Sequence, residues 1–139
     1  LTPGAVLIVT ADHGQVMVGT NTMPPHPEVM AMVAYQSGEG RFRWLHARDG
    51  VQVELLARAT THHSNVAWVA SKEQVIDENW LGPRLGSATR KRLGDVVLVP
   101  REPISFDDAA DTGPFILQCR HGALTDDELD VPLLAMAVK

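Results

Sequence analysis

The sequence predicts an α/β fold, and three features support this class. Ala5–Val9 is a run of five apolar residues, typical of a strand buried on both faces in a parallel sheet. Residues 41–100 alternate between strand-like and helix-like stretches. Val131–Val138 adds a second apolar strand near the other end. We therefore expect residues 1–40 and 101–139 to build one sheet-based core, with 41–100 as a small inserted α/β subdomain.

The stretch before residue 41 is mostly irregular. Residues 15–19 suit either a short strand or a loop, and residues 21–27 contain three prolines that rule out a regular element. Residues 28–36 fit a short helix or a strand, and the pattern leaves both open. Ser37-Gly38-Glu39-Gly40 is a cluster of turn residues, which makes it a plausible boundary.

The inserted unit is expected to run strand, helix, strand, helix, strand. Residues 41–48 form the first strand, whose arginines and histidine are expected to line a solvated face. Residues 51–61 form a helix with inward-facing Val53, Leu56 and Ala57. A strand at 65–70 leads into a helix capped by Ser71, with Gln74 at the capping-box position, and the last strand is 94–100.

The region after residue 100 begins with a polar loop. Residues 101–114 carry an acidic run that lacks the glycine and final glutamate of a calcium loop, so we expect it to be solvated. Residues 115–119 are strand-like, and the DDEL stretch suits a helical turn capped by Thr125, with Glu128 as its capping-box partner.

Composition excludes several classes of protein. The chain has 139 residues, which is one-domain size, and its net charge of −5 argues against a nucleic-acid backbone as the main partner. No apolar run is long enough to cross a bilayer, and no signal peptide is visible. Cys119 is the single cysteine, so an intrachain disulfide and a cysteine-rich zinc finger are excluded; this favours a cytoplasmic location without fixing it.

Candidate metal ligands follow the first predicted strand. Asp12 and His13 lie at its carboxyl end, where open α/β sheets bind ligands. A carboxylate beside an imidazole suits zinc, and Gly14 lets the backbone turn away. The alternative is an ordinary turn tripeptide. His121, also followed by glycine, comes after the strand-like 115–119 and is a third candidate ligand.

Three further histidines are interpreted as structural. His26 lies in the proline-rich loop and is expected to be a solvated surface residue rather than a ligand. His62 and His63 end the predicted helix, where a histidine suits the helix dipole, and metal binding is the less favoured interpretation.

Two motifs together resemble a known family. Thr10-Ala11-Asp12-His13-Gly14, followed late in the chain by His-Gly-x-Leu-Thr-x-x-Glu-Leu-x-Val-Pro-Leu-Leu from His121, is similar to the C-terminal part of the alkaline phosphatase superfamily. Within it, the chain most resembles the bacterial type I phosphodiesterase/nucleotide pyrophosphatase branch. The resemblance implies two zinc ions, or manganese or another divalent metal, at the carboxyl ends of a central sheet. It assigns Asp12 and His13 to one ion and His121 to the other.

The resemblance also shows what this chain lacks. The family's Thr or Ser nucleophile, and further Asp and His ligands, have no counterpart here. The chain begins at Leu1 and enters its first strand at once, so we expect it to lack its natural N-terminus. We thus expect a C-terminal fragment of an enzyme that hydrolyses phosphodiesters or nucleotides. The fragment itself should be inactive and, with an uncovered strand face, should self-associate. The alternative is a non-catalytic binding or assembly module with relic ligands.

Overall fold

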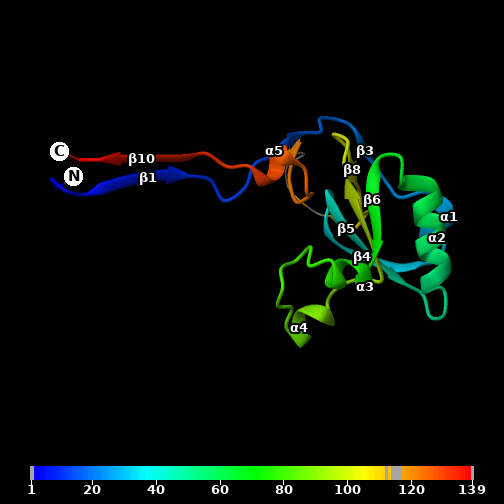
Figure 1. Ribbon diagram of the computed structural model, residues 1–139. Coiled ribbons are helices and arrows are strands. Elements are labelled where there is room, and N and C mark those ends of the chain that lie inside the picture. The colour runs from blue at the N-terminus through cyan, green and yellow to red at the C-terminus, as the bar shows by residue number, and fades with distance from the viewer. Residues whose placement is uncertain (1, 112, 114–116, 139) are drawn as a thin grey trace.

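The computed structural model describes residues 2–138 except 112 and 114–116. It consists of an α/β body from which a long two-stranded ribbon projects (Figure 1). The body is organised around one antiparallel sheet with the strand order β4-β5-β7-β6, made of β4 (Val33–Glu39), β5 (Phe42–Ala47), β7 (Val96–Pro100) and β6 (Ala67–Ser71). The two central strands, β5 and β7, carry most of this sheet's own buried apolar residues.

Strand β7 shows why the sheet is buried on both faces. All five of its residues are buried. Val96 and Leu98 join a core with Leu55 of helix α2 (Gln52–His63), which runs along one face of the sheet with the short helix α1 (Pro27–Met30) (Figure 1). Val97 and Val99 point to the opposite face, where Val75 and Ala123 cover them. This strict alternation gives a continuous apolar run in a strand covered on two sides.

The predicted alternation over residues 41–100 is confirmed. The order is β5, α2, β6, α3 (Lys72–Asp77) and β7, with the added short helix α4 (Ser87–Arg90) before β7. The Ser71 hydroxyl caps α3 by accepting a hydrogen bond from the Gln74 amide at 3.1 Å, as the sequence predicted. Residues 28–36, for which helix and strand were both open, divide between α1 and β4.

The predicted inner face of the 51–61 helix is wrong. Leu55, Ala59 and His63 are its buried residues, whereas Val53 is 86% exposed. Residues spaced by four lie one above the other on a helix, so the 55-59-63 stripe faces the sheet and Val53 faces solvent. Leu56 packs only at the edge of this core.

The predicted solvated face of β5 is also wrong. Arg41, just before the strand, and Arg43 within it are each only 1% exposed, and His46 is buried. Arg43 donates hydrogen bonds to the carbonyl oxygens of Phe106 and Gly38 and to the Asp111 carboxylate, and Asp108 lies 4.0 Å away. The acidic run at 107–111, expected to be solvated, therefore supplies part of the charge that makes this arginine burial tolerable.

The expected domain boundary near residue 40 coincides with a tight turn. Residues 40–41 join β4 to β5, so β4 belongs to the same sheet as the strands of 41–100. Gly38 in this hairpin has φ +84°, and a Cβ there would lie 2.4 Å from the Phe42 carbonyl oxygen. Only glycine combines that backbone angle with so close an approach. The division into 1–40 with 101–139 and 41–100 stays a prediction.

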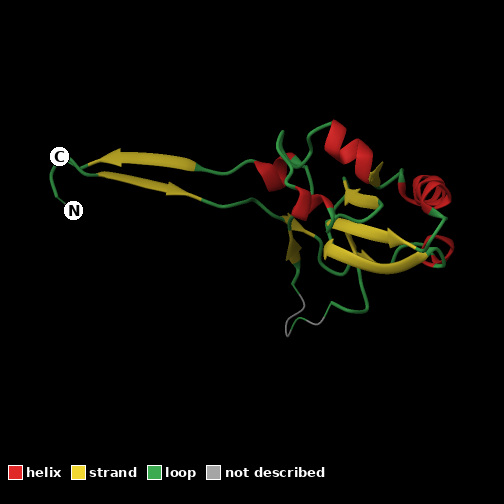
Figure 2. Cartoon of the chain, turned by 90° about the horizontal axis from the view of Figure 1, so that it is seen from below, coloured by secondary structure: helices red, strands yellow, loops and turns green. Residues whose placement is uncertain are grey.

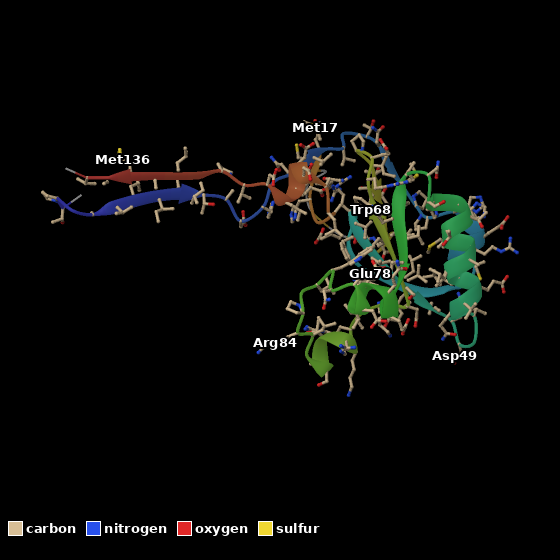
Figure 3. The ribbon with its side chains drawn as sticks, viewed as in Figure 1. Met17, Asp49, Trp68, Glu78, Arg84 and Met136 are labelled. Atoms are coloured by element: carbon tan, nitrogen blue, oxygen red, sulfur yellow. The ribbon has the colours of Figure 1, made fainter. Side chains whose placement is uncertain are left out.

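Strand β1 (Val6–Thr10) differs from the buried parallel strand that was expected. It pairs antiparallel with β10 (Leu133–Ala137), and all ten residues of the two strands are exposed. Figures 1 and 2 show this ribbon running away from the body, and the labelled Met136 in Figure 3 stands clear of it. The apolar sequence was interpreted correctly as a strand, but its burial depends on surfaces that the described part of the chain does not supply.

Two short strand pairs tie the base of the ribbon to the body. β2 (Val16–Met17) pairs antiparallel with β9 (Cys119–Arg120), and β3 (Thr22–Met23) pairs parallel with β8 (Ser105–Phe106). The expectation that residues 21–27 hold no regular element is therefore wrong at β3, which precedes the prolines of this segment. The strand expected at 115–119 lies partly outside the described residues, and β9 begins at its last residue. None of the helices in the described part of the chain has the length and apolar character needed to span a membrane.

The ribbon leads to a prediction about solution behaviour. Val9 and Leu134 lie opposite each other, as do Leu7 and Met136, so cross-strand pairing puts these four apolar side chains on one face. We expect the chain to self-associate in sedimentation velocity experiments as concentration rises, because this exposed face is apolar.

The matched test combines Val9→Lys with Leu134→Glu, which places opposite charges across the pair and so preserves strand pairing. This variant should sediment as a monomer. Val53→Lys, which changes another exposed valine, on α2 and away from the ribbon, should associate like the wild type. A wild-type chain that stays monomeric at all concentrations contradicts the prediction.

Candidate metal centre

The three predicted ligands meet at the base of the ribbon. Asp12 and His13 lie between β1 and β2, and His121 directly follows β9. The rings of His13 and His121 stack with their centroids 3.7 Å apart and their planes 15° from parallel. One Asp12 carboxylate oxygen is 3.8 Å from Nε2 of His13. The chain thus brings together two histidines from opposite ends of the sequence.

Two backbone contacts hold these loops together. The antiparallel pairs Val16↔Arg120 and Met17↔Cys119 align β2 with β9, and Met17 marks this position in Figure 3. The Gly14 amide also donates a hydrogen bond to the Glu128 carbonyl oxygen at 2.9 Å. A Cβ on residue 14 would lie 2.0 Å from the Asp127 carbonyl oxygen, so glycine is required by the close packing of this loop on helix α5 (Asp126–Leu129).

Helix α5 is in turn anchored by a buried ion pair. The Arg41 guanidinium donates from Nε and Nη2 to the two carboxylate oxygens of Glu128, each at 2.7 Å. Both side chains are almost fully buried. The same carboxylate accepts hydrogen bonds from the Ala123 amide and the Thr125 hydroxyl. The segment that follows His121 is therefore fixed to the sheet through one carboxylate.

This arrangement replaces the expected capping box. Helix α5 does begin after Thr125, as predicted, but no side chain caps its N-terminus. Thr125 donates its hydroxyl proton to Glu128, and Glu128 turns inward to Arg41 instead of back to the Thr125 amide. Sequence reasoning missed Arg41 because the partner lies far along the chain. The only local signal was an arginine directly before a strand with apolar residues.

By itself, burial would raise the pKa of the Glu128 carboxyl. The hydrogen bonds from Arg41, Thr125 and the Ala123 amide outweigh burial, so the pKa lies below the ordinary value of 4.5. Glu128 is accordingly ionised at neutral pH and serves as an acceptor for four donors at once.

The tautomer of His13 suits a metal ligand. Its Nδ1 is 2.7 Å from the Gly14 carbonyl oxygen, which can only accept, so Nδ1 carries the proton. Its other ring nitrogen, Nε2, faces Asp12. Their separation of 3.8 Å is within reach of two bonds of roughly 2 Å to one zinc ion. A backbone carbonyl that orients a histidine in this way is typical of metal sites.

The donor set fits zinc in kind but is incomplete. Asp12 is 91% exposed and the His13 side chain 41% exposed, so both remain accessible to further ligands. Among the residues that the structure describes, the compact group of three ligand atoms within 4.8 Å is a different one, formed by His26, Glu28 and His62. Asp12, His13 and His121 therefore do not form one closed tetrahedral site among the described residues.

The expected role of His26 as a solvated residue is wrong. His26 is half-buried, its amide donates to Nε2 of His63 at 3.1 Å, and its ring stacks on His62 at 3.6 Å. His63 is buried against Phe106, and burial, followed by the charges of His62 and His26, lowers the pKa of His63 to about 4. His63 is thus a neutral core residue: it ends α2, as predicted, but without a charge it does not make the predicted favourable interaction with the helix dipole.

Comparison with solved structures identifies the fold. The chain is similar to phosphonoacetate hydrolase from Sinorhizobium meliloti 1021, solved in complex with phosphonoacetate, with a TM-score of 0.68 and 21% sequence identity over 98% of this chain and 37% of that one. It is also similar to human ectonucleotide pyrophosphatase/phosphodiesterase 5, with a TM-score of 0.62 and 18% identity over 94% and 33% of the two chains. The mouse counterpart gives a TM-score of 0.66 and 17% identity over 96% and 34%.

These likenesses confirm the expected fold class, α/β with an alkaline-phosphatase-like fold. The chain spans about a third of the length of the structures it matches. No protein-family model matches the sequence. No curated protein matches it either.

The close packing of Gly14 leads to a prediction. Gly14→Ala should push α5 away from the His13 loop, because the new methyl group would overlap the Asp127 carbonyl. We expect the ring protons of His13 and His121 to lose their mutual ring-current shifts in the NMR spectrum, and the free energy of unfolding to fall by about 1–3 kcal/mol.

Gly86→Ala is the matched control, because no atom lies within 4 Å of a Cβ there and its φ of −66° suits any residue. It should leave both the spectrum and the stability unchanged. Unaltered ring shifts in Gly14→Ala would contradict the proposed role of this contact.

The lowered pKa of Glu128 predicts a pH dependence of stability. Its contribution is fully present above 4.5, the ordinary glutamate pKa, and is lost as pH falls through the lower pKa of the folded state. Glu128→Gln should lower the free energy of unfolding at pH 7 by about 3–5 kcal/mol, because Arg41 is left buried without a counter-charge. It should also flatten the fall in stability below pH 4.5.

Urea denaturation at a series of pH values measures both effects. Glu73→Gln, at an exposed glutamate of α3, should retain the wild-type pH profile. A Glu128→Gln profile parallel to that of the wild type would show that Glu128 does not titrate as described.

Proposed function

We propose that this chain is part of a two-zinc hydrolase of phosphorus esters, with phosphodiesters or nucleotides as its substrate class. The observation that carries the proposal is the stacking of His13 on His121 at 3.7 Å, beside Asp12. The two residues belong to the two motifs that resemble the alkaline phosphatase superfamily, and the fold agrees with that resemblance.

In this proposal each residue has a separate task. Asp12 and His13 hold one ion, with the carboxylate as a charged oxygen ligand and Nε2 as a neutral nitrogen ligand. The Gly14 carbonyl keeps the His13 ring oriented by accepting the Nδ1 proton. His121 supplies a ligand to the second ion from the neighbouring loop. Paired zinc ions, when bound, stabilise the attacking and leaving oxygens of an in-line phosphoryl displacement.

The remaining ligands and the Thr or Ser nucleophile are proposed to lie outside this chain. The family forms a covalent intermediate on that hydroxyl, which water then hydrolyses. The isolated chain is accordingly expected to be inactive. Its exposed ligands are then available to be completed by another part of the same enzyme.

A phosphonate is a second candidate substrate. The phosphonoacetate hydrolase matches this chain at a TM-score of 0.68 and the mouse nucleotide pyrophosphatase at 0.66, so the fold supports both chemistries equally. Sulfatases and phosphomonoesterases share these metal ligands by family resemblance. We place phosphodiesters first because the late motif from His121 most resembles that branch.

The test uses the open reading frame that contains this chain, expressed with its flanking codons. The enzyme proposal expects an upstream Thr or Ser after an apolar strand, preceded by an Asp. The product should hydrolyse a nitrophenyl nucleotide diester in the presence of zinc. His13→Ala and His121→Ala should each reduce kcat/KM by at least about a hundredfold, because each removes a metal ligand.

His46→Gln is a control for losing a histidine elsewhere, since His46 is buried beside Tyr35 and Ser37 in the sheet. It should retain activity wherever the protein folds. Hydrolysis of phosphonoacetate but not of the diester would favour the second candidate. A start codon directly before Leu1 and no hydrolysis would favour the non-catalytic module.

A further inference from the structure

A second group of metal-ligating side chains lies at the junction of α1 and α2, in the body of the protein. His26 and Glu28 come from the start of α1, and His62 comes from the last turn of α2. One ligand atom from each residue lies within 4.8 Å of the others. We propose that these three residues bind a zinc ion at a site distinct from Asp12, His13 and His121.

The packing of the two helices creates this group. The ring of His26 stacks on that of His62 with centroids 3.6 Å apart and planes 9° from parallel. The Glu28 carboxylate reaches the same place, with Oε2 at 3.2 Å from Nε2 of His62. Residues from two helices separated by a strand hairpin thus converge on one point.

The backbone behind the group is fixed. The His26 amide donates to Nε2 of buried His63 at 3.1 Å, and His63 packs edge-on against Phe106 in the core. The His26 carbonyl oxygen accepts the amides of Val29 and Met30. The site is therefore supported by the core on one side, while its ligands remain partly exposed on the other.

The donor set is that of an open zinc site. Two histidines and one glutamate leave a fourth position for water. Zinc would replace the proton that lies between Nε2 of His62 and the Glu28 carboxylate. The rings must rotate out of their stack to direct both lone pairs at the ion.

A salt bridge competes with the metal. Arg58 donates to the same Oε2 of Glu28 at 3.2 Å and also lies 3.7 Å from Glu54. The Arg58 cation and a zinc ion would compete for Oε2 of Glu28, so each would weaken the interaction of the other with this oxygen. Zinc binding should therefore be stronger when Arg58 is neutralised, a response that a purely structural salt bridge does not predict.

Zinc titration calorimetry on the whole 139-residue chain is the first measurement. The wild type should bind zinc and gain thermal stability, because the ion links α1 to α2. His62→Gln and Glu28→Gln should each weaken binding by at least about tenfold and abolish the gain in Tm. Arg58→Gln should bind more tightly than the wild type.

His13→Ala and His121→Ala separate this site from the other candidate centre, and neither should affect the binding that His62→Gln removes. Far-UV circular dichroism without metal should show that all variants retain the fold, since the substituted side chains are not in the core. Cobalt, bound in place of zinc, should give visible bands of tetrahedral geometry in the wild type but not in His62→Gln.

Two results overturn the proposal: no zinc binding by the wild type, or binding that persists in both His62→Gln and Glu28→Gln. Neither result bears on the hydrolase, which depends on His13 and His121. Conversely, loss of hydrolase activity in His13→Ala and His121→Ala would not count against zinc binding at the α1–α2 site.

Discussion

The buried ion pair between Arg41 and Glu128 is the interaction on which the arrangement of the molecule depends. Besides its bidentate contact with Glu128, the Arg41 guanidinium donates to the carbonyl oxygens of Glu102 and Ile104, both at 2.8 Å. One side chain thus joins the start of β5, the segment after β7 and helix α5. Desolvating two charges is costly, and only the full set of hydrogen bonds on each partner offsets that cost. Such a pair contributes less to net stability than to fixing a single arrangement, because any other pairing leaves a charge buried and unsatisfied.

The candidate metal centre obtains its geometry from this buried pair rather than from its own residues. Asp12, His13 and His121 are exposed and have few contacts of their own. Their loops are positioned because Glu128 fixes α5, and α5 accepts the Gly14 amide beside His13. Exposed ligands supported by a rigid buried network can accept an ion without reorganising the fold. This division of roles also explains why a glycine is needed at position 14, where the two loops approach most closely.

Local chemistry was predictable from the sequence, and long-range chemistry was not. The alternation of elements over 41–100 and the Ser71 cap depend on residues a few positions apart, and both are confirmed. The three candidate ligands were selected because each follows a predicted strand, and the structure places His13 against His121. Arg41 was misjudged because its burial depends on Glu128, which no local pattern links to it. Val53 was misjudged because the sequence of α2 allows either of two sides of the helix to face inward. Only the position of the sheet decides which side is buried.

The exposed ribbon and the incomplete ligand set have one physical origin. Strand β1 is apolar on both faces. Its partner β10 forms hydrogen bonds along one edge of β1 and covers neither of its faces. Asp12 and His13 follow this strand within a few residues, so whatever covers β1 must also approach these ligands. In the proposed enzyme, a single set of neighbouring strands would therefore bury the apolar ribbon and deliver the missing ligands and nucleophile to its end. In that enzyme the apolar strand faces and the candidate metal ligands would belong to one interface, and burial of the strand faces would supply the driving force for assembling the metal centre.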